Sequence, residues 1–134
     1  MPGPLAATIE AANESLLVNG NDAADRFFAP GYVAHGTGRD LTGGPDAVRR
    51  FVGMLHGAFS NLEVTVDILA ETTDRVAWQR TLAGTQSGSY MGFPATGRRV
   101  VWRDMIVSRF VDGVIAEDWV VTDLAERLLL ARKG

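Results

Sequence analysis

One aspartate stands in an otherwise apolar stretch and is the first candidate for acid/base chemistry. Asp104 lies between Trp102 and Ile106 in an alternating run that predicts a β-strand, so the three side chains share one face. A carboxylate on an apolar face is costly unless it is paired, and burial suits such a group to general base or acid catalysis. Two interpretations stay open: Asp104 moves a proton in a pocket, or it pairs with Arg98 or Arg80 or faces solvent.

Three kinds of polar side chain could assist Asp104. Asp118 falls in the next predicted strand, where it belongs either to the same site or to a solvated sheet edge. His35 could orient a substrate carbonyl or relay a proton, or it could only tie a loop to the helices. Tyr32 and Tyr90 could donate hydrogen bonds to an oxyanion, although tyrosines at such edges more often pack.

The hydrophobic periodicity supplies the elements that must position these residues. Helical spacing followed by a run of long alternating segments predicts an α+β fold, with N-terminal helices packed on a cone-shaped, curved antiparallel sheet around a pocket. One domain over residues 1–134 accounts for the length. We expect helices at 5–18, 22–28, 46–59 and 123–131, about four long strands at 62–68, 75–85, 99–110 and 114–122, a short extended piece at 32–35 and a loop at 39–44.

Composition narrows the classes of function. Thirteen Lys and Arg against sixteen Asp and Glu give a net charge of −3 with no basic run, which argues against nucleic acid as a partner. The chain has no long apolar stretch and no targeting segment, so we expect a cytoplasmic protein that does not bind membranes. Two histidines without any cysteine or phosphate-binding loop predict neither a metal site nor a resident cofactor.

Several motifs together resemble one known family. Residues 84–98, G-T-Q-S-G-S-Y-M-G-F-P-A-T-G-R, resemble the SnoaL-like signature G-T-H-x-G-x-[FY]-x-G-x-P-P-T-G-R. Residues 110–119, F-V-D-G-V-I-A-E-D-W, followed by Asp123, are similar to the same family's F-x-D-G-K-I-x-E-H-W-x-x-x-D. Gly44-Pro45 and the Y-V-A-H segment at 32–35 match its earlier parts. Their order and spacing identify the chain as a member of the SnoaL-like branch of the nuclear transport factor 2-like superfamily.

The resemblance implies a pocket between a curved sheet and its helices, and polyketide cyclases that close rings by intramolecular aldol reactions. Related branches include isomerases, epoxide hydrolases and non-catalytic ligand binders, so the fold alone does not fix the reaction. The catalytic aspartate of the cyclases aligns with Val120, and their supporting glutamine and histidine align with Asp104 and Ile106. This chain therefore lacks the family's base and carries a carboxylate on the neighbouring strand.

The hairpin at Asp112-Gly113 decides which side chains face the pocket. A two-residue turn would pair Val111 with Val114, whereas a three-residue loop with a glycine bulge would pair Phe110 with Val114. We favour the bulged form, which sets Asp104 opposite Val120 and Ile106 opposite Asp118 and agrees with the family's pocket positions. The pocket residues expected on this basis are Trp102, Ile106, Val120, Val100, Tyr32, Tyr90, Phe51 and Leu55.

Two classes of function follow. The first is a cofactor-free enzyme performing cyclisation, isomerisation or hydrolysis on a hydrophobic polyketide-like carbonyl or epoxide compound, with Asp104, His35 and Asp118 as its acid/base groups. The second is a pocketed ligand-binding or scaffold protein without chemistry. An apolar patch on the convex sheet face, made of Met105, Val107, Ile115, Trp119 and Val121, also predicts a homodimer.

Overall fold

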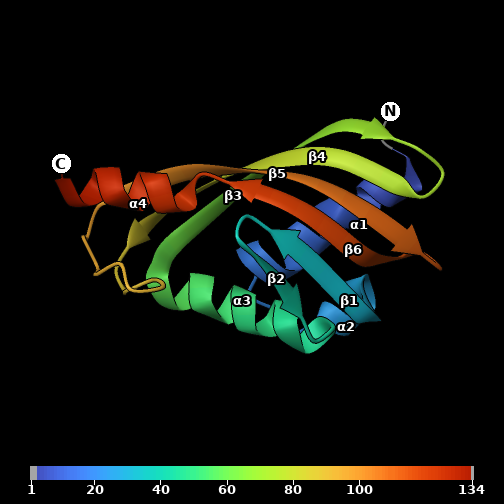
Figure 1. Cartoon of the computed structure of the whole chain (residues 1–134), viewed down its shortest axis with the longest axis horizontal. Helices are drawn as coiled ribbons and strands as arrows, with labels where there is room; N and C mark the ends of the chain where they lie inside the picture. Colours follow the sequence, from blue (N-terminus) through green and yellow to red (C-terminus); the bar gives the residue numbers. More distant parts are fainter. Residues whose placement is uncertain (1–2, 134) are drawn as a thin grey trace.

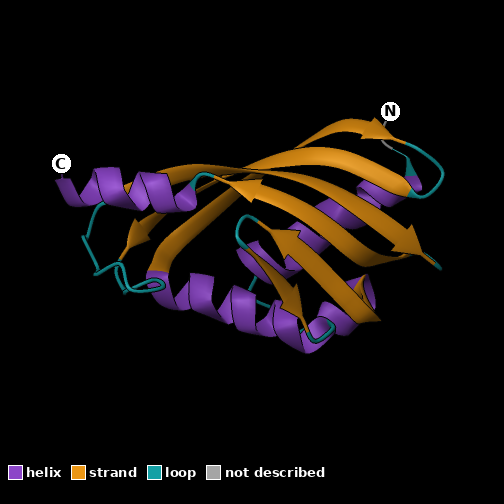
Figure 2. Ribbon diagram, in the orientation of Figure 1, coloured by secondary structure: helices purple, strands orange, loops and turns teal. Residues whose placement is uncertain are grey.

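A curved, six-stranded sheet covers a layer of helices in the computed structural model, which describes residues 3–133 (Figures 1 and 2). Within these residues no helix has both the length and the apolar character needed to cross a bilayer. In chain order the elements are α1 (Pro4–Ala12), the π-helix η1 (Asn13–Val18), α2 (Ala24–Phe27), β1 (Phe28–Gly36), β2 (Arg39–Thr42), α3 (Pro45–Ala58), β3 (Phe59–Glu71), β4 (Arg75–Gln86), β5 (Arg99–Val111), β6 (Val114–Thr122) and α4 (Leu124–Lys133).

The strand order is β2-β1-β6-β5-β4-β3, and every neighbouring pair is antiparallel except β1 with β6, which is parallel. The predicted α+β class with a curved, mostly antiparallel sheet is confirmed. The loop expected at residues 39–44 is wrong in part, because its first four residues form β2 as an edge strand on β1. A positive φ at Gly38 allows the tight turn between these two strands.

The β5–β6 hairpin combines features of the two registers considered from the sequence. Asp112 and Gly113 both have positive φ, and they form a two-residue turn that pairs Val111 with Val114. A bulge then leaves Ala116 without a partner, so that the register shifts by one residue. The register that we favoured is therefore wrong by two residues: Asp104 lies opposite Thr122, not Val120.

A shift of two residues leaves each side chain on its expected face, because side chains in a strand alternate with a period of two. Every second side chain of β5 is buried on the concave face, from Val100 to Phe110. On β6, Asp118 is buried and directly faces Ser108 of β5. The face assignment from the sequence thus holds for β5 and for β6 beyond the bulge, although the exact pairing does not. It is wrong for Ile115, which was expected on the convex face and is buried in the core.

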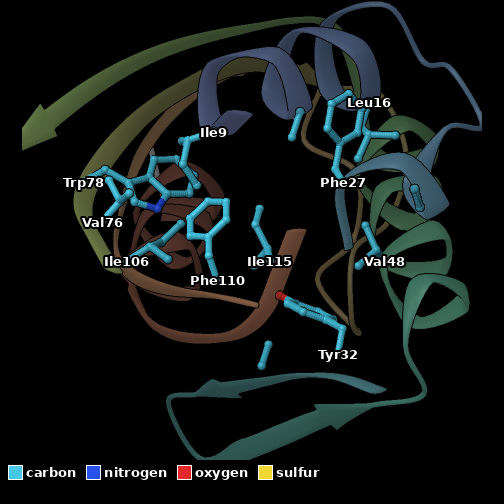
Figure 3. Packing of buried hydrophobic residues seen from close by; sticks show 13 residues of the cluster. Ile9, Leu16, Phe27, Tyr32, Val48, Val76, Trp78, Ile106, Phe110 and Ile115 are labelled. Atoms are coloured by element: carbon cyan, nitrogen blue, oxygen red, sulfur yellow. The ribbon is translucent and has the colours of Figure 1, made fainter. Parts of the chain in front are cut away.

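The core divides into two clusters at opposite ends of the concave face. One gathers around Trp78, Phe110 and Ile115, with Tyr32 pointing inward from β1 (Figure 3). The other gathers around Phe59 and Trp102, whose rings lie 4.6 Å apart, and is completed by α4. Because both clusters draw on the same strands and on the N-terminal helices, they hold the sheet at a fixed distance from those helices.

A glycine, Gly44, sets the start of α3, whose buried side chains pack in the core beneath the concave face of the sheet. Gly44 has φ 66° and ψ −149°, a region open almost only to glycine. A Cβ at this position would also run into the carbonyl oxygen of Pro30. The close approach lets the amide of Gly44 donate to the carbonyl of Tyr32 at 3.2 Å.

We therefore expect Gly44→Ala to lower the free energy of unfolding by about 1–3 kcal/mol through backbone strain alone, and by more if Pro30 cannot move. Urea denaturation measures the change. Gly31→Ala is the control, since Gly31 has an ordinary φ and open space around it. Equal stability of the two variants would contradict this account of the α3 entry.

Candidate functional site

A cavity of about 590 Å³ lies between the concave sheet face and the helices. Its walls come from α1, η1, β1, β2, α3, β4, β5, β6, α4 and the loop at residues 90–93, and most of the lining side chains are apolar. Seven of the side chains expected from the sequence line it: Trp102, Ile106, Val120, Tyr32, Tyr90, Phe51 and Leu55. Val100, the eighth, is not among the lining residues, because it is buried within the cluster around Phe59 and Trp102.

The Asp104 carboxylate enters this cavity as half of an ion pair. Arg80 lies directly opposite Asp104 on β4, and its Nε donates to Oδ2 at 2.8 Å. The same guanidinium donates through Nη1 to Oδ1 of Asn13 at 2.9 Å. Of the two interpretations considered from the sequence, the structure thus shows the ion pair with Arg80. Asp104 also lines the cavity, and it is only 4% exposed.

Asn13 reaches Arg80 from the first residue of the π-helix. Its amide donates to the carbonyl of Ile9 at 2.8 Å, which directs the side-chain oxygen toward the guanidinium. Widened helical turns of this kind are frequent at functional sites. Two side chains, Asp104 of β5 and Asn13 of η1, therefore hold the guanidinium of Arg80 at the cavity wall.

Asp118 forms a second polar group on the same wall. It is buried on the concave face, where Tyr32 donates to Oδ2 at 2.6 Å and Ser108 donates to Oδ1 at 2.5 Å. Ser108 in turn accepts the indole N–H of Trp78 at 3.0 Å, and an indole can only donate, so the serine proton must point to the carboxylate. The interpretation of Asp118 as a solvated edge residue is wrong.

The two carboxylates differ in their electrostatic environment. Burial raises the pKa of Asp118 above its ordinary 3.8, against the opposing effects of the Ser108 and Tyr32 hydroxyls and the charge of Arg80. Burial, followed by the nearby charge of Asp118, also raises the pKa of Tyr32, so this phenol keeps its proton. Asp104, by contrast, contacts a guanidinium directly. Carboxylates placed in unlike environments are a recurring basis for acid/base assignments.

His35 lies outside the cavity, which corrects its expected place at the site. It pairs with Trp119 across the parallel β1–β6 ladder and so shares the convex face with it. The ring stacks on Trp119 with centroids 5.6 Å apart, and its nitrogens contact Glu117 at 2.5 Å and Asp40 at 3.1 Å. The Glu117 carboxylate, with help from Asp40, raises the pKa of His35.

Sequence analysis named Arg80 only as a possible partner of Asp104, and it missed Asn13, which holds Arg80, and Ser108, which donates to Asp118. The alternation of Arg80 with Trp78 indicates that both side chains share one face of β4, but only the structure shows that Arg80 lies opposite Asp104. Within residues 3–133, no group of three or more His, Asp or Glu side chains is arranged to hold a metal ion.

We expect Arg80→Met to lower the free energy of unfolding by about 3–5 kcal/mol, because it leaves the Asp104 charge buried without its partner. Urea denaturation at neutral pH measures this. The double variant Arg80→Met with Asp104→Leu removes both charges and should regain most of the loss. A single variant as stable as the parent would show that the pair is not the support of this wall.

Known structures share this fold over almost the whole chain. AclR, a candidate hydroxylase from Streptomyces galilaeus, is 26% identical with a TM-score of 0.81, covering 97% of this chain and 96% of its own. IdmH, a candidate polyketide cyclase from Streptomyces antibioticus, is 26% identical with a TM-score of 0.79, covering 97% and 99%. A candidate cyclase from Acidithiobacillus ferrooxidans, at 21% identity and a TM-score of 0.82, covers 99% and 97% and supports the fold alone.

No curated protein matches the chain at a significant level. The sequence model of the SnoaL-like polyketide cyclase family, however, matches residues 6–129, which include every wall of the cavity. The chain therefore belongs to the SnoaL-like polyketide cyclase family.

Proposed function

We propose that this protein is a cofactor-free acid/base enzyme that acts on a hydrophobic, polyketide-like carbonyl compound held in the cavity. The observation that carries the proposal is that two polar groups line one mostly apolar cavity: Asp118, a buried carboxylate of raised pKa, and Arg80, a guanidinium held by Asp104 and Asn13. The family, named for polyketide cyclases, supplies the substrate class. The expected base position of that family holds Val120 here, so the reaction needs another proton acceptor.

Asp118 is the group that we assign to proton transfer. As a carboxylate it takes a proton from the carbon next to the substrate carbonyl, and the C–H electron pair moves to give an enolate. Tyr32 and Ser108 hold the carboxylate in place by donating to its two oxygens. A pKa raised by burial makes such a base stronger at neutral pH than an exposed aspartate.

Arg80 is the group that we assign to the enolate oxygen. A preorganised cation in an apolar site stabilises a developing negative charge more strongly than solvent does. Asp104 and Asn13 keep the guanidinium in place, so Asp104 acts here as a positioning residue and not as the base expected from the sequence. Attack of the enolate carbon on a second carbonyl closes a ring, and the resulting alkoxide takes the proton back from Asp118.

The second candidate is a ligand-binding protein without chemistry. The observation in its favour is the Asp104–Arg80 ion pair, which neutralises the carboxylate that the sequence had singled out. The two candidates differ in whether the protein accelerates proton exchange at carbon.

We expect the protein to catalyse exchange of the α-protons of 2-tetralone, a neutral hydrophobic ketone, for deuterium in D₂O. Asp118→Asn keeps the shape but removes the base, so the exchange rate should fall by roughly 100-fold or more. The parent rate should rise with pH through an ionisation above 3.8, since only the deprotonated carboxylate accepts a proton and burial raises its pKa. Proton NMR follows the loss of signal.

Asp104→Asn separates the two roles, because it loosens Arg80 but leaves Asp118 in place. We expect a loss of roughly tenfold for this variant. His35→Gln is the control outside the cavity and should exchange at the parent rate. A parent protein that binds 2-tetralone without accelerating exchange would support the binding candidate instead.

We further propose that two copies associate through the convex face of β5 and β6. Met105, Trp119 and Val121 are 49%, 36% and 66% exposed there, and Met105 lies opposite Val121. Ile115 does not belong to this patch, because the bulge at Ala116 turns its side chain into the core. An exposed apolar strip on two central strands favours self-association about a twofold axis.

Light scattering at micromolar concentration should give the mass of a dimer for the parent and of a monomer for Val121→Glu. Leu130→Glu, which changes an equally exposed apolar side chain on α4, should remain dimeric. A monomeric parent would refute the association.

A further inference from the structure

Two arginines line the cavity without an ion pair to any carboxylate of residues 3–133. Arg39 is the first residue of β2, and Arg50 lies on α3; both are exposed and both contribute to the cavity wall. Exposed residues of a cavity wall mark its solvent side, whereas Arg80 and Asp104 are largely buried. The cavity therefore has an apolar interior and a cationic mouth.

The positive charge of this mouth is not cancelled within residues 3–133. Neither Arg39 nor Arg50 has a carboxylate within ion-pair distance there, although acidic residues adjoin both. Asp40 contacts His35 instead, and Asp46 contacts Arg49. In a chain whose net charge is −3, two guanidiniums without an ion pair therefore line one cavity.

A backbone contact positions the guanidinium of Arg50 beside β2. Nη2 of Arg50 donates to the carbonyl of Thr42 at 3.4 Å and packs against Gly43, where an added Cβ would lie 3.2 Å from it. Arg39 lines the same cavity as the buried phenol of Tyr90. Both cations are thus near the ligand space.

We propose that the cavity binds a hydrophobic compound carrying a carboxylate, with the carboxylate at Arg39 and Arg50 and the apolar body inside. The inference rests on the proposed ligand cavity and adds the class of compound that it selects. A guanidinium matches a carboxylate with two parallel N–H···O bonds, and such charge-assisted bonds are stronger than neutral ones. The anion fixes which end of the ligand points inward, toward Asp118 and Arg80.

Calorimetric titration with 2-naphthoate and with its uncharged methyl ester tests the proposal. The two probes share the ring system and differ in charge, so their affinity ratio isolates the contribution of the mouth. We expect the acid to bind at least about tenfold more tightly than the ester to the parent. In the double variant Arg39→Gln with Arg50→Gln the ratio should fall to within about twofold, with the ester affinity unchanged.

Arg132→Gln, an equal charge change on an exposed residue of α4 outside the cavity wall, is the control and should keep the parent ratio. Added NaCl should weaken binding of the acid but not of the ester.

Equal affinity of acid and ester for the parent would overturn the carboxylate assignment but not the ligand cavity. A preference for the acid that survives the double variant would have the same meaning. Tighter binding of 2-naphthyl phosphate than of 2-naphthoate would overturn it in favour of a phosphate. Failure of all probes to bind would overturn the ligand cavity itself.

Discussion

A buried charge in an apolar cavity has to be paired, and the arrangement of this site follows from that constraint. Arg80 and Asp104 face each other directly across two central strands, so the sheet itself sets their distance. Asn13 then fixes the guanidinium from the N-terminal helices. Because the charges of Arg80 and Asp104 are paired, the cavity can carry these two polar side chains, and that of Asp118, in an otherwise mostly apolar lining.

Strand alternation separates this chemistry from the charges on the other side of the sheet. Asp118 and Glu117 are neighbours in sequence, yet one lies buried beside Tyr32 and the other bonds His35 on the convex face. The inner carboxylate has its pKa raised by burial and the outer one has its pKa lowered, with the hydrogen bond to His35 the largest cause. The pKa values of two adjacent carboxylates thus shift in opposite directions, because the pleat of the strand points the two side chains to opposite faces of the sheet.

The faces of β5 could be predicted from sequence because its large apolar residues Trp102, Ile106 and Phe110 are spaced by even numbers of residues. The exact register could not, since it depends on an unpaired Ala116 whose small side chain leaves no sign in the pattern. His35 was misplaced because its face depends on a parallel contact with β6 that is distant in sequence. The role of Arg80 depends likewise on contacts from β5 and η1, which no local pattern near residue 80 records.

The central claim is that Asp118 is the titrating group of the cavity, and a carbon-13 NMR titration of the aspartate side-chain carboxyls tests it most directly. The Asp118 signal is assigned by its absence in Asp118→Asn. The account predicts that this carboxyl ionises above the ordinary 3.8, because burial outweighs the hydrogen bonds from Tyr32 and Ser108. Ionisation at or below 3.8 would contradict it, since the carboxylate would then be a weak base held only for structure.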